Sequence, residues 1–114
     1  MIRNLVELLA DASHYGRRAQ AYVRGIELAD FVADTMRREA VCFCLTVVGE
    51  ACDRVSKELT PLPPDIPWPQ IKEMRNILVH EYWQIHDVTV YNVARHDAPK
   101  LADQLDEIRI RLEA

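Results

Sequence analysis

Long apolar runs, a signal peptide and a surplus of positive charge are all missing from this sequence. No stretch approaches the roughly 18 apolar residues that a membrane-spanning helix needs. The N-terminal residues lack the charged region and the apolar core of a secretory signal. The net charge is −4, whereas proteins that bind nucleic acids are usually basic. We therefore expect a cytoplasmic protein that binds no membrane, and any binding of RNA needs a local positive cleft or a partner.

Cysteine is scarce, and its placement excludes two further classes of protein. The chain has three cysteines, Cys42, Cys44 and Cys52. An odd number of thiols in a chain without a visible signal peptide argues against a disulfide framework. Cys42 and Cys44 have neither a second thiolate pair nor suitably spaced histidines to complete a zinc site. We interpret all three as small core residues and predict neither a metal nor another cofactor.

Apolar residues recur every three or four positions through most of the chain, which is typical of amphipathic helices. No run alternates in the manner of a strand. The spacing predicts helices over about residues 2–26, 35–59, 69–83 and 88–96, and a last helix carrying Leu101, Leu105, Ile108 and Leu112. With 114 residues the chain has room for one domain, residues 1–114. We predict an all-α fold, an antiparallel bundle of four to six helices.

The helix predicted over 35–59 is apolar around much of its circumference, so we expect it to be the most buried helix. Asp30 or Asp34 is a candidate cap for its start. Gly49 lies in its middle, where glycine costs about 1 kcal/mol relative to alanine, and such a glycine commonly permits close helix packing. In the helix before it, Gly16 predicts a kink or a split into two pieces, and Gly25 lies near the end.

Most of the prolines lie between residues 60 and 69, which predicts a stiff extended connector. Pro69 suits the first turn of the next helix, because its missing N–H is harmless there. Further along, Asp87 is the expected cap of the helix over 88–96. Asp97 and Pro99 are expected to interrupt the chain and to begin the last helix.

The polar residues of the run 75–82 fall on different faces of the predicted helix. Asn76 and His80 share one face, and Arg75 and Tyr82 share another. Arg75 and His80 lie about 140° apart on an ideal helix. A bend of the long arginine side chain, or unwinding of the helix near Glu81, brings the Arg75 and His80 side chains partly together. A second copy of the helix, across a dimer interface, brings an arginine and a histidine into one cleft more easily. The spacing therefore favours a symmetric homodimer.

These residue types suit metal-independent cleavage of RNA. Histidine exchanges a proton near neutral pH, so His80 can take the proton of a 2′-hydroxyl or protonate the leaving oxygen. Arg75 offers a planar fork of N–H donors that stabilises charge on a phosphate, and Asn76 can orient the ring or the substrate. On spacing alone a second interpretation stays open, in which Arg75 and His80 are a chance pair and His80 is a hydrogen-bonded histidine of the bundle.

The run from Arg75 to Tyr82 matches the pattern R-x-x-x-x-H-x-Y, and in this the chain resembles the HEPN superfamily, in particular its HepT-like branch. The likeness covers roughly residues 40–105 and is most specific at Arg75–Tyr82. Further segments follow in the same order: Gly49-Glu-Ala51, Arg54-Val-Ser56, Ile66-Pro-Trp68 and Asp97-Ala-Pro-Lys-Leu101. The resemblance implies a helical homodimer that acts as a metal-independent endoribonuclease, with its active site in a composite cleft at the dimer interface.

The resemblance also implies a biological setting and a role for each motif residue. HepT-like proteins are typically toxins paired with a minimal nucleotidyltransferase (MntA-like) antitoxin, which silences them by transferring AMP to the motif tyrosine. Carried over, Arg75 and His80 are the catalytic pair, Asn76 assists them and Tyr82 is the modification site. An adenylate on Tyr82 adds charge and bulk near His80, so it repels an RNA phosphate. The other interpretation of Tyr82 is a half-buried packing aromatic.

Residues outside the motif are weaker candidates. Glu50 is a possible cleft residue, although a capped or solvent-exposed glutamate explains it at least as well. Arg54 and Lys57 are possible phosphate contacts, but a plain solvated face is the favoured interpretation of both. Trp68 is expected to be a packing anchor. Three histidines are expected on the surface: His14, His86 and His96.

A different class of function also fits the sequence, a non-catalytic HEPN scaffold that binds a nucleotidyltransferase and assists it. The acidic net charge favours this interpretation, because RNA is weakly attracted at long range. The complete Arg75, His80 and Tyr82 set favours the ribonuclease. A structural dimer without nucleotide chemistry requires the motif to be a coincidence.

Overall fold

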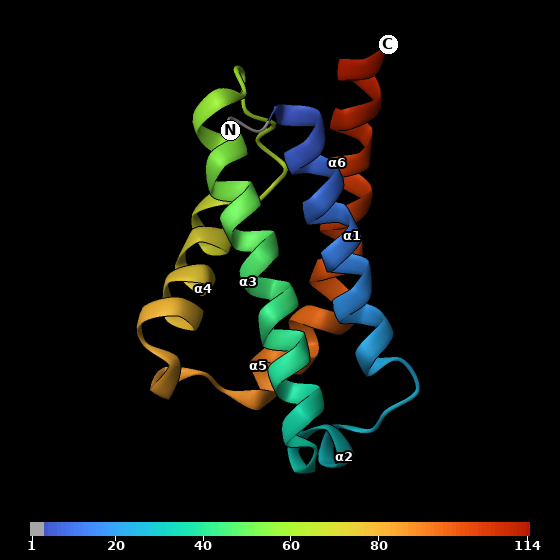
Figure 1. Ribbon diagram of the computed structural model, residues 1–114, viewed down its shortest axis with the longest axis vertical. Coiled ribbons are helices and arrows are strands. Elements are labelled where there is room, and N and C mark those ends of the chain that lie inside the picture. The colour runs from blue at the N-terminus through green and yellow to red at the C-terminus, as the bar shows by residue number, and fades with distance from the viewer. Residues whose placement is uncertain (1–3) are drawn as a thin grey trace.

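The computed structural model describes residues 4–114, and all the regular structure in this range is helical (Figure 1). Its elements are α1 (Leu5–Val23), α2 (Leu28–Ala33), α3 (Thr35–Glu58), α4 (Trp68–His80), a 3₁₀ turn (Tyr82–Gln84), α5 (Asp87–Asn92), a π turn (Val93–Asp97) and α6 (Ala98–Glu113). In Figure 1, α1 and α4 run downward while α3 and α6 run upward. This confirms the predicted all-α antiparallel bundle. Within residues 4–114, no helix is both long and apolar enough to cross a membrane.

The core consists of two clusters stacked along the bundle. The first joins α1, α3 and α6 around Leu9, Val55 and Leu105, all fully buried. The second joins the other ends of α1 and α3 to α2 and α5 around Phe31 and Val90. Because α3 contacts α1, α2, α4 and α5, it is the central helix, as predicted.

One side of α3 nevertheless faces solvent, although its sequence is apolar around much of its circumference. Met36 is 83% exposed and Phe43 is 60% exposed. On a helix they fall within about 60° of Val47, Glu50 and Arg54. We call these five residues the outer stripe of α3. The thiols lie on other faces: Cys44 and Cys52 are buried and Cys42 is half-buried, which confirms their interpretation as core residues.

Local capping explains where the first helices begin and end. Asn4 accepts a hydrogen bond from the Glu7 amide and caps the start of α1. Residues 2 and 3 of the predicted helix lie outside the described residues. Asp34 caps α3 by accepting from the Arg37 amide. α1 passes through Gly16 unbroken, so the predicted split is wrong, and Gly25 follows its end with a φ of 72°. The short helix α2 was not predicted.

The proline-rich segment before α4 contains no helix, as predicted, but it is not a straight extended connector. It turns at residues 64–65, and Ile66 inserts into the first core cluster with 3% of its surface exposed. The Trp68 ring donates from its indole nitrogen to the Pro63 carbonyl at 3.1 Å and packs on the same cluster. Burial of these two side chains pulls the segment back onto the bundle, and it confirms Trp68 as a packing anchor.

Two predicted helix boundaries are wrong. α4 ends at His80 rather than near residue 83, and Glu81 leaves the helical conformation with φ −135° and ψ 43°. This turn allows Ile85 to pack on the second core cluster. At the other site, α5, the π turn and α6 run on without a break, so Asp97 caps nothing. The Ala98 amide bonds five residues back to Val93, directly before Pro99, which has no N–H to donate.

Asp87 likewise does not cap a helix with its side chain. It is the first residue of α5, and its carboxylate pairs with Arg38 of α3 at 3.2 Å. The sequence pattern therefore located the start of the helix correctly, but the Asp87 side chain forms an ion pair with Arg38 instead of capping the helix.

Candidate functional site

Arg75, the first residue of the motif, lies where α4 packs closely against α3. A Cβ atom built on Gly49 would lie 2.5 Å from the Cβ of Arg75 and 2.8 Å from its Cγ. Real Cβ atoms do not come so close, so only glycine allows this contact. Gly49 therefore allows the first carbons of the Arg75 side chain to lie against α3, which confirms its predicted role in close helix packing.

The Arg75 side chain is held by two neighbours. Its Nε donates to one oxygen of Glu50 at 2.9 Å, and a terminal nitrogen donates to the other oxygen at 3.3 Å. The second terminal nitrogen donates to Oδ1 of Asn76 at 2.7 Å. The hydrogen bond that Arg75 donates to Glu50 raises the pKa of Arg75 above its ordinary value. These bonds leave N–H donors of the guanidinium free for a phosphate.

His80 is the last residue of α4 and is exposed. Within residues 4–114 it makes no hydrogen bond or ion pair, so the interpretation as a hydrogen-bonded bundle histidine is wrong. Asn76 lies one turn before it on the same face, as predicted. Arg75 lies about 140° around the helix and about 7.5 Å along it. Because α4 stays regular up to His80, the helix itself does not turn Arg75 and His80 toward one another.

Tyr82 lies beyond α4, in the 3₁₀ turn, and therefore does not share a helix face with Arg75. It is 71% exposed, and its ring contacts that of Trp83 edge-on at 5.6 Å between centroids. The interpretation of Tyr82 as a half-buried packing aromatic is wrong. The turn leaves Tyr82 largely exposed to solvent, two positions after His80.

The two basic candidates on α3 differ in their surroundings. Lys57 pairs with Asp53 at 3.0 Å, and this hydrogen bond lowers the pKa of Asp53, with Lys72 and Arg75 close enough to add to the effect. Arg54 is exposed and lies one turn beyond Glu50 on the outer stripe.

Lys72 was not singled out in the sequence. It is exposed on α4, and with Asn76, Glu81 and Gln84 it lines a shallow depression. The sequence did contain a signal for it: Lys72 precedes Arg75 and Asn76 by three and four residues, and residues with this spacing are neighbours on a helix.

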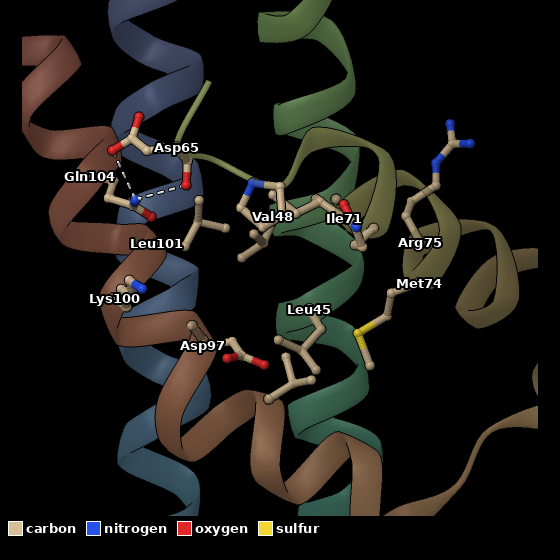
Figure 2. Close-up of a pocket in the computed structure, with 15 residues that line it drawn as sticks. Leu45, Val48, Asp65, Ile71, Met74, Arg75, Asp97, Lys100, Leu101 and Gln104 are labelled. Atoms are coloured by element: carbon tan, nitrogen blue, oxygen red, sulfur yellow. Dashed lines mark hydrogen bonds between the residues drawn. The ribbon is translucent and has the colours of Figure 1, made fainter. Parts of the chain in front are cut away.

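A separate cavity of about 310 Å³ lies between α3, α4 and α6. Figure 2 shows its mainly apolar walls, with Leu45, Ile71 and Leu101 among them, and a polar edge that includes Lys100. Arg75 lies at one side of this cavity, and its guanidinium group points away from it (Figure 2). The cavity and the polar motif are therefore separate features.

The remaining histidines lie outside the motif region, and His14, His86 and His96 are all exposed, as predicted. Within residues 4–114, no three histidine, cysteine, aspartate or glutamate side chains come together as a metal site would require.

Comparison with known proteins is consistent over most of the chain. The family model described as "Ribonuclease HepT-like" matches residues 12–108. The chain is 27% identical to a "Probable ribonuclease HepT" of Thermococcus cleftensis, over 96% of this chain and 99% of that protein. It is 26% identical to a "Putative RNase" of Methanocaldococcus jannaschii, over 93% and 88% of the two chains. It is 33% identical to another of Caldanaerobacter subterraneus, over 75% and 77%. No solved structure matches the chain.

Proposed function

The chain belongs to the HepT-like ribonuclease family, and from this premise we propose that it is a metal-independent endoribonuclease, the toxin of a toxin–antitoxin pair. The observation that carries the proposal is the arrangement on α4. Arg75 is held by Glu50 and Asn76 and retains N–H donors that can bind a phosphate, and the exposed His80 is the last residue of the same helix. Cleavage of RNA needs these two kinds of group, one for charge and one for proton transfer.

In the proposed reaction the 2′-oxygen of a ribose attacks the adjacent phosphorus. Its proton passes to His80, the new O2′–P bond forms, and the P–O5′ bond breaks. The leaving 5′-oxygen takes a proton from solvent, His80 afterwards returns its proton to solvent, and the other product is a 2′,3′-cyclic phosphate. The guanidinium of Arg75 stabilises the charge that develops on the phosphate oxygens.

The catalytic test uses purified wild-type protein, Arg75→Ala and His80→Ala, with His96→Ala as a matched surface control. We expect RNA cleavage by wild type and His96→Ala, unchanged in excess EDTA, and losses of at least about 100-fold in the two motif variants. Expression in cells should arrest growth only where cleavage is retained. Equal toxicity of the wild type and both motif variants, or toxicity in none of them, would contradict the proposal.

The active site is proposed to form between two copies of the chain. Arg75 and His80 are directed apart on one helix, and the outer stripe of α3 carries exposed Phe43 about two turns before Glu50 and exposed Met36 about two turns before Phe43. A second copy on this stripe buries apolar surface and brings its own α4 to the cleft. Sedimentation should show a dimer that Phe43→Asp weakens by about 10-fold or more in Kd, because a carboxylate is then buried in the interface.

Mixing two inactive variants tests whether the site is shared. If arginine and histidine come from different chains, Arg75→Ala and His80→Ala subunits together rebuild one intact site in each heterodimer. After random exchange, half of the dimers are heterodimers with one working site of two, so about a quarter of the wild-type activity should return. If the mixture stays inactive although the subunits exchange, the shared site is wrong.

Tyr82 is proposed to be the off-switch. Its hydroxyl oxygen attacks the α-phosphorus of ATP in the active site of a nucleotidyltransferase antitoxin, pyrophosphate leaves, and the phenol proton is lost. The 71% exposure of Tyr82 supports access by such an enzyme. After co-expression with the antitoxin, intact mass should show added AMP and lost cleavage. Tyr82→Phe should stay unmodified; an AMP adduct that persists in this variant places the modification elsewhere.

Two observations favour the alternative, a non-catalytic scaffold for a nucleotidyltransferase. The net charge is −4, and Glu50 places a carboxylate beside the arginine that RNA would contact. A scaffold binds the nucleotidyltransferase equally well with Arg75→Ala and cleaves no RNA in any form. The cleavage assay above separates the two functions.

A further inference from the structure

The carboxylate of Glu50 is an unexpected group beside an RNA-cleavage site. The Glu50 side chain is 48% exposed and lies in direct contact with Arg75. A negative charge here repels RNA phosphates and partly offsets the positive charge of the arginine. A neutral residue would bind RNA better, so the carboxylate needs another role if this site cleaves RNA.

The geometry of the contact indicates that role. Glu50 accepts from Nε and from one terminal nitrogen, so it occupies one edge of the planar guanidinium with both of its oxygens. Asn76 accepts from the other terminal nitrogen. An arginine fork held in this way cannot rotate freely, and its unused N–H donors keep one direction.

The same helix also fixes the base of the side chain. Gly49, the residue before Glu50, allows the Cβ and Cγ of Arg75 to lie against the α3 backbone. α3 therefore holds Arg75 at both ends, through Gly49 at its root and Glu50 at its tip. The side chain of Arg75 is only 20% exposed, in keeping with a restrained group.

We propose that Glu50 is a positioning residue for Arg75: it holds one edge of the guanidinium so that the remaining N–H donors are directed at the RNA phosphate. This rests on the proposed ribonuclease function. Glu50 itself touches neither the phosphate nor the proton that moves. Preorganisation of this kind acts on the transition state, because a small misplacement of a charge-stabilising group is costly there.

The test compares Glu50→Gln, Glu50→Asp and the control Glu58→Gln, which removes the same charge from an exposed position at the end of α3. Glu50→Asp keeps the charge but shortens the reach. With a short RNA as substrate, we expect kcat to fall about 10- to 100-fold in both Glu50 variants. KM should not rise in Glu50→Gln, because a repulsive charge has been removed. Glu58→Gln should match wild type, and melting curves should show all variants folded.

A spectroscopic measurement tests the contact without any RNA. The Nε–H resonance of Arg75, assigned by its absence in Arg75→Lys, should be protected from exchange in wild type and in Glu58→Gln. It should shift and exchange faster in Glu50→Gln. An unchanged resonance in Glu50→Gln would overturn the proposal, because the anchor would then not exist in solution.

The kinetic outcomes separate the failure of this proposal from failure of the proposed function. No cleavage by wild type refutes the ribonuclease itself. Cleavage by wild type with unchanged kcat in both Glu50 variants refutes the positioning role alone. A rise of kcat in Glu50→Gln also refutes the positioning role and identifies the ion pair as an inhibitory contact. If Glu58→Gln loses as much kcat as Glu50→Gln, the loss is a general effect of charge and the positioning role is refuted.

Discussion

Replacing Gly49 with alanine tests the contact on which the site is built. The added Cβ would lie 2.5 Å from the Cβ of Arg75 and 3.5 Å from its Cα. Ordinary contacts of this kind are at least 3.4 Å, so α4 must move away from α3 by about 1 Å. The colliding atoms belong to the root of the arginine, next to the backbone, so rotation of a flexible tip cannot relieve the clash.

Two effects of opposite sign set the magnitude of this change. Overpacking of this kind costs up to about 3 kcal/mol. Alanine in mid-helix returns about 1 kcal/mol relative to glycine. The difference predicts that Gly49→Ala lowers the free energy of unfolding by about 2 kcal/mol, or roughly 8 °C in Tm for a chain of this size. Because Arg75 moves with α4, RNA cleavage should fall as well.

Gly16 of α1 offers a matched control for this substitution. A Cβ at Gly16 would lie 3.2 Å from the Ala98 carbonyl oxygen and 3.6 Å from the Ala102 Cβ, so only a small adjustment is needed. The gain in helix propensity offsets this cost, and Gly16→Ala should stay within about 1 kcal/mol of wild type.

Urea unfolding followed by circular dichroism, at one protein concentration for all variants, measures both changes. If Gly49→Ala is as stable as wild type or more stable, helix propensity alone decides the outcome, and the argument from close approach is wrong. An equal loss of stability in Gly16→Ala would also refute it.

Two further predictions concern thiol reactivity and acid stability. Burial raises the pKa of Cys52 to about 12, so it should react with a thiol reagent at pH 8 only after unfolding, whereas half-buried Cys42 should react in the folded protein. Rapid labelling of Cys52 in the native state, read by peptide mass, would contradict its burial. Burial alone would raise the pKa of Asp106, but hydrogen bonds from Ser13 and Arg17 hold it below its usual value. A lowered carboxyl pKa contributes stability above the unfolded value of 3.8, and this contribution is lost as the pH falls below it. Asp106→Asn should therefore lower Tm at pH 7 and reduce its decline between about pH 5 and pH 2; an unchanged decline would show that Asp106 has no part in it.

The residue motif and most helices were predictable from the sequence, for physical reasons. Helix periodicity follows from which side chains must be buried, and α1, α3 and α6 bury most of the residues that their spacing indicates, although Met36, Phe43 and Leu112 are exposed. Asp34 caps its own helix through a contact three residues away, so local sequence suffices to predict it. The run 75–82 was recognisable because its residue types and spacing are themselves the signal.

The errors lie where a distant partner decides the local structure. α4 ends at His80 without a glycine or proline, because Ile85 must reach the second core cluster. The π turn before Pro99 replaces the predicted break and keeps α5 and α6 in one helical stretch. Met36 and Phe43 continue the apolar pattern of α3 and yet are exposed. Periodicity shows which residues share a helix face, but it does not show whether another element packs on that face.

By itself the sequence determined that this chain is helical and that Arg75, Asn76, His80 and Tyr82 fall within three turns of one another, since both follow from residue spacing along the chain. Only the tertiary structure decided that Gly49 admits Arg75 to the surface of α3, that Glu50 holds its guanidinium and that Tyr82 stands exposed beyond the helix. These contacts join residues far apart in the sequence, and their distances depend on how two helices pack. Packing is set by the shapes of all the buried side chains together, and no local pattern contains it.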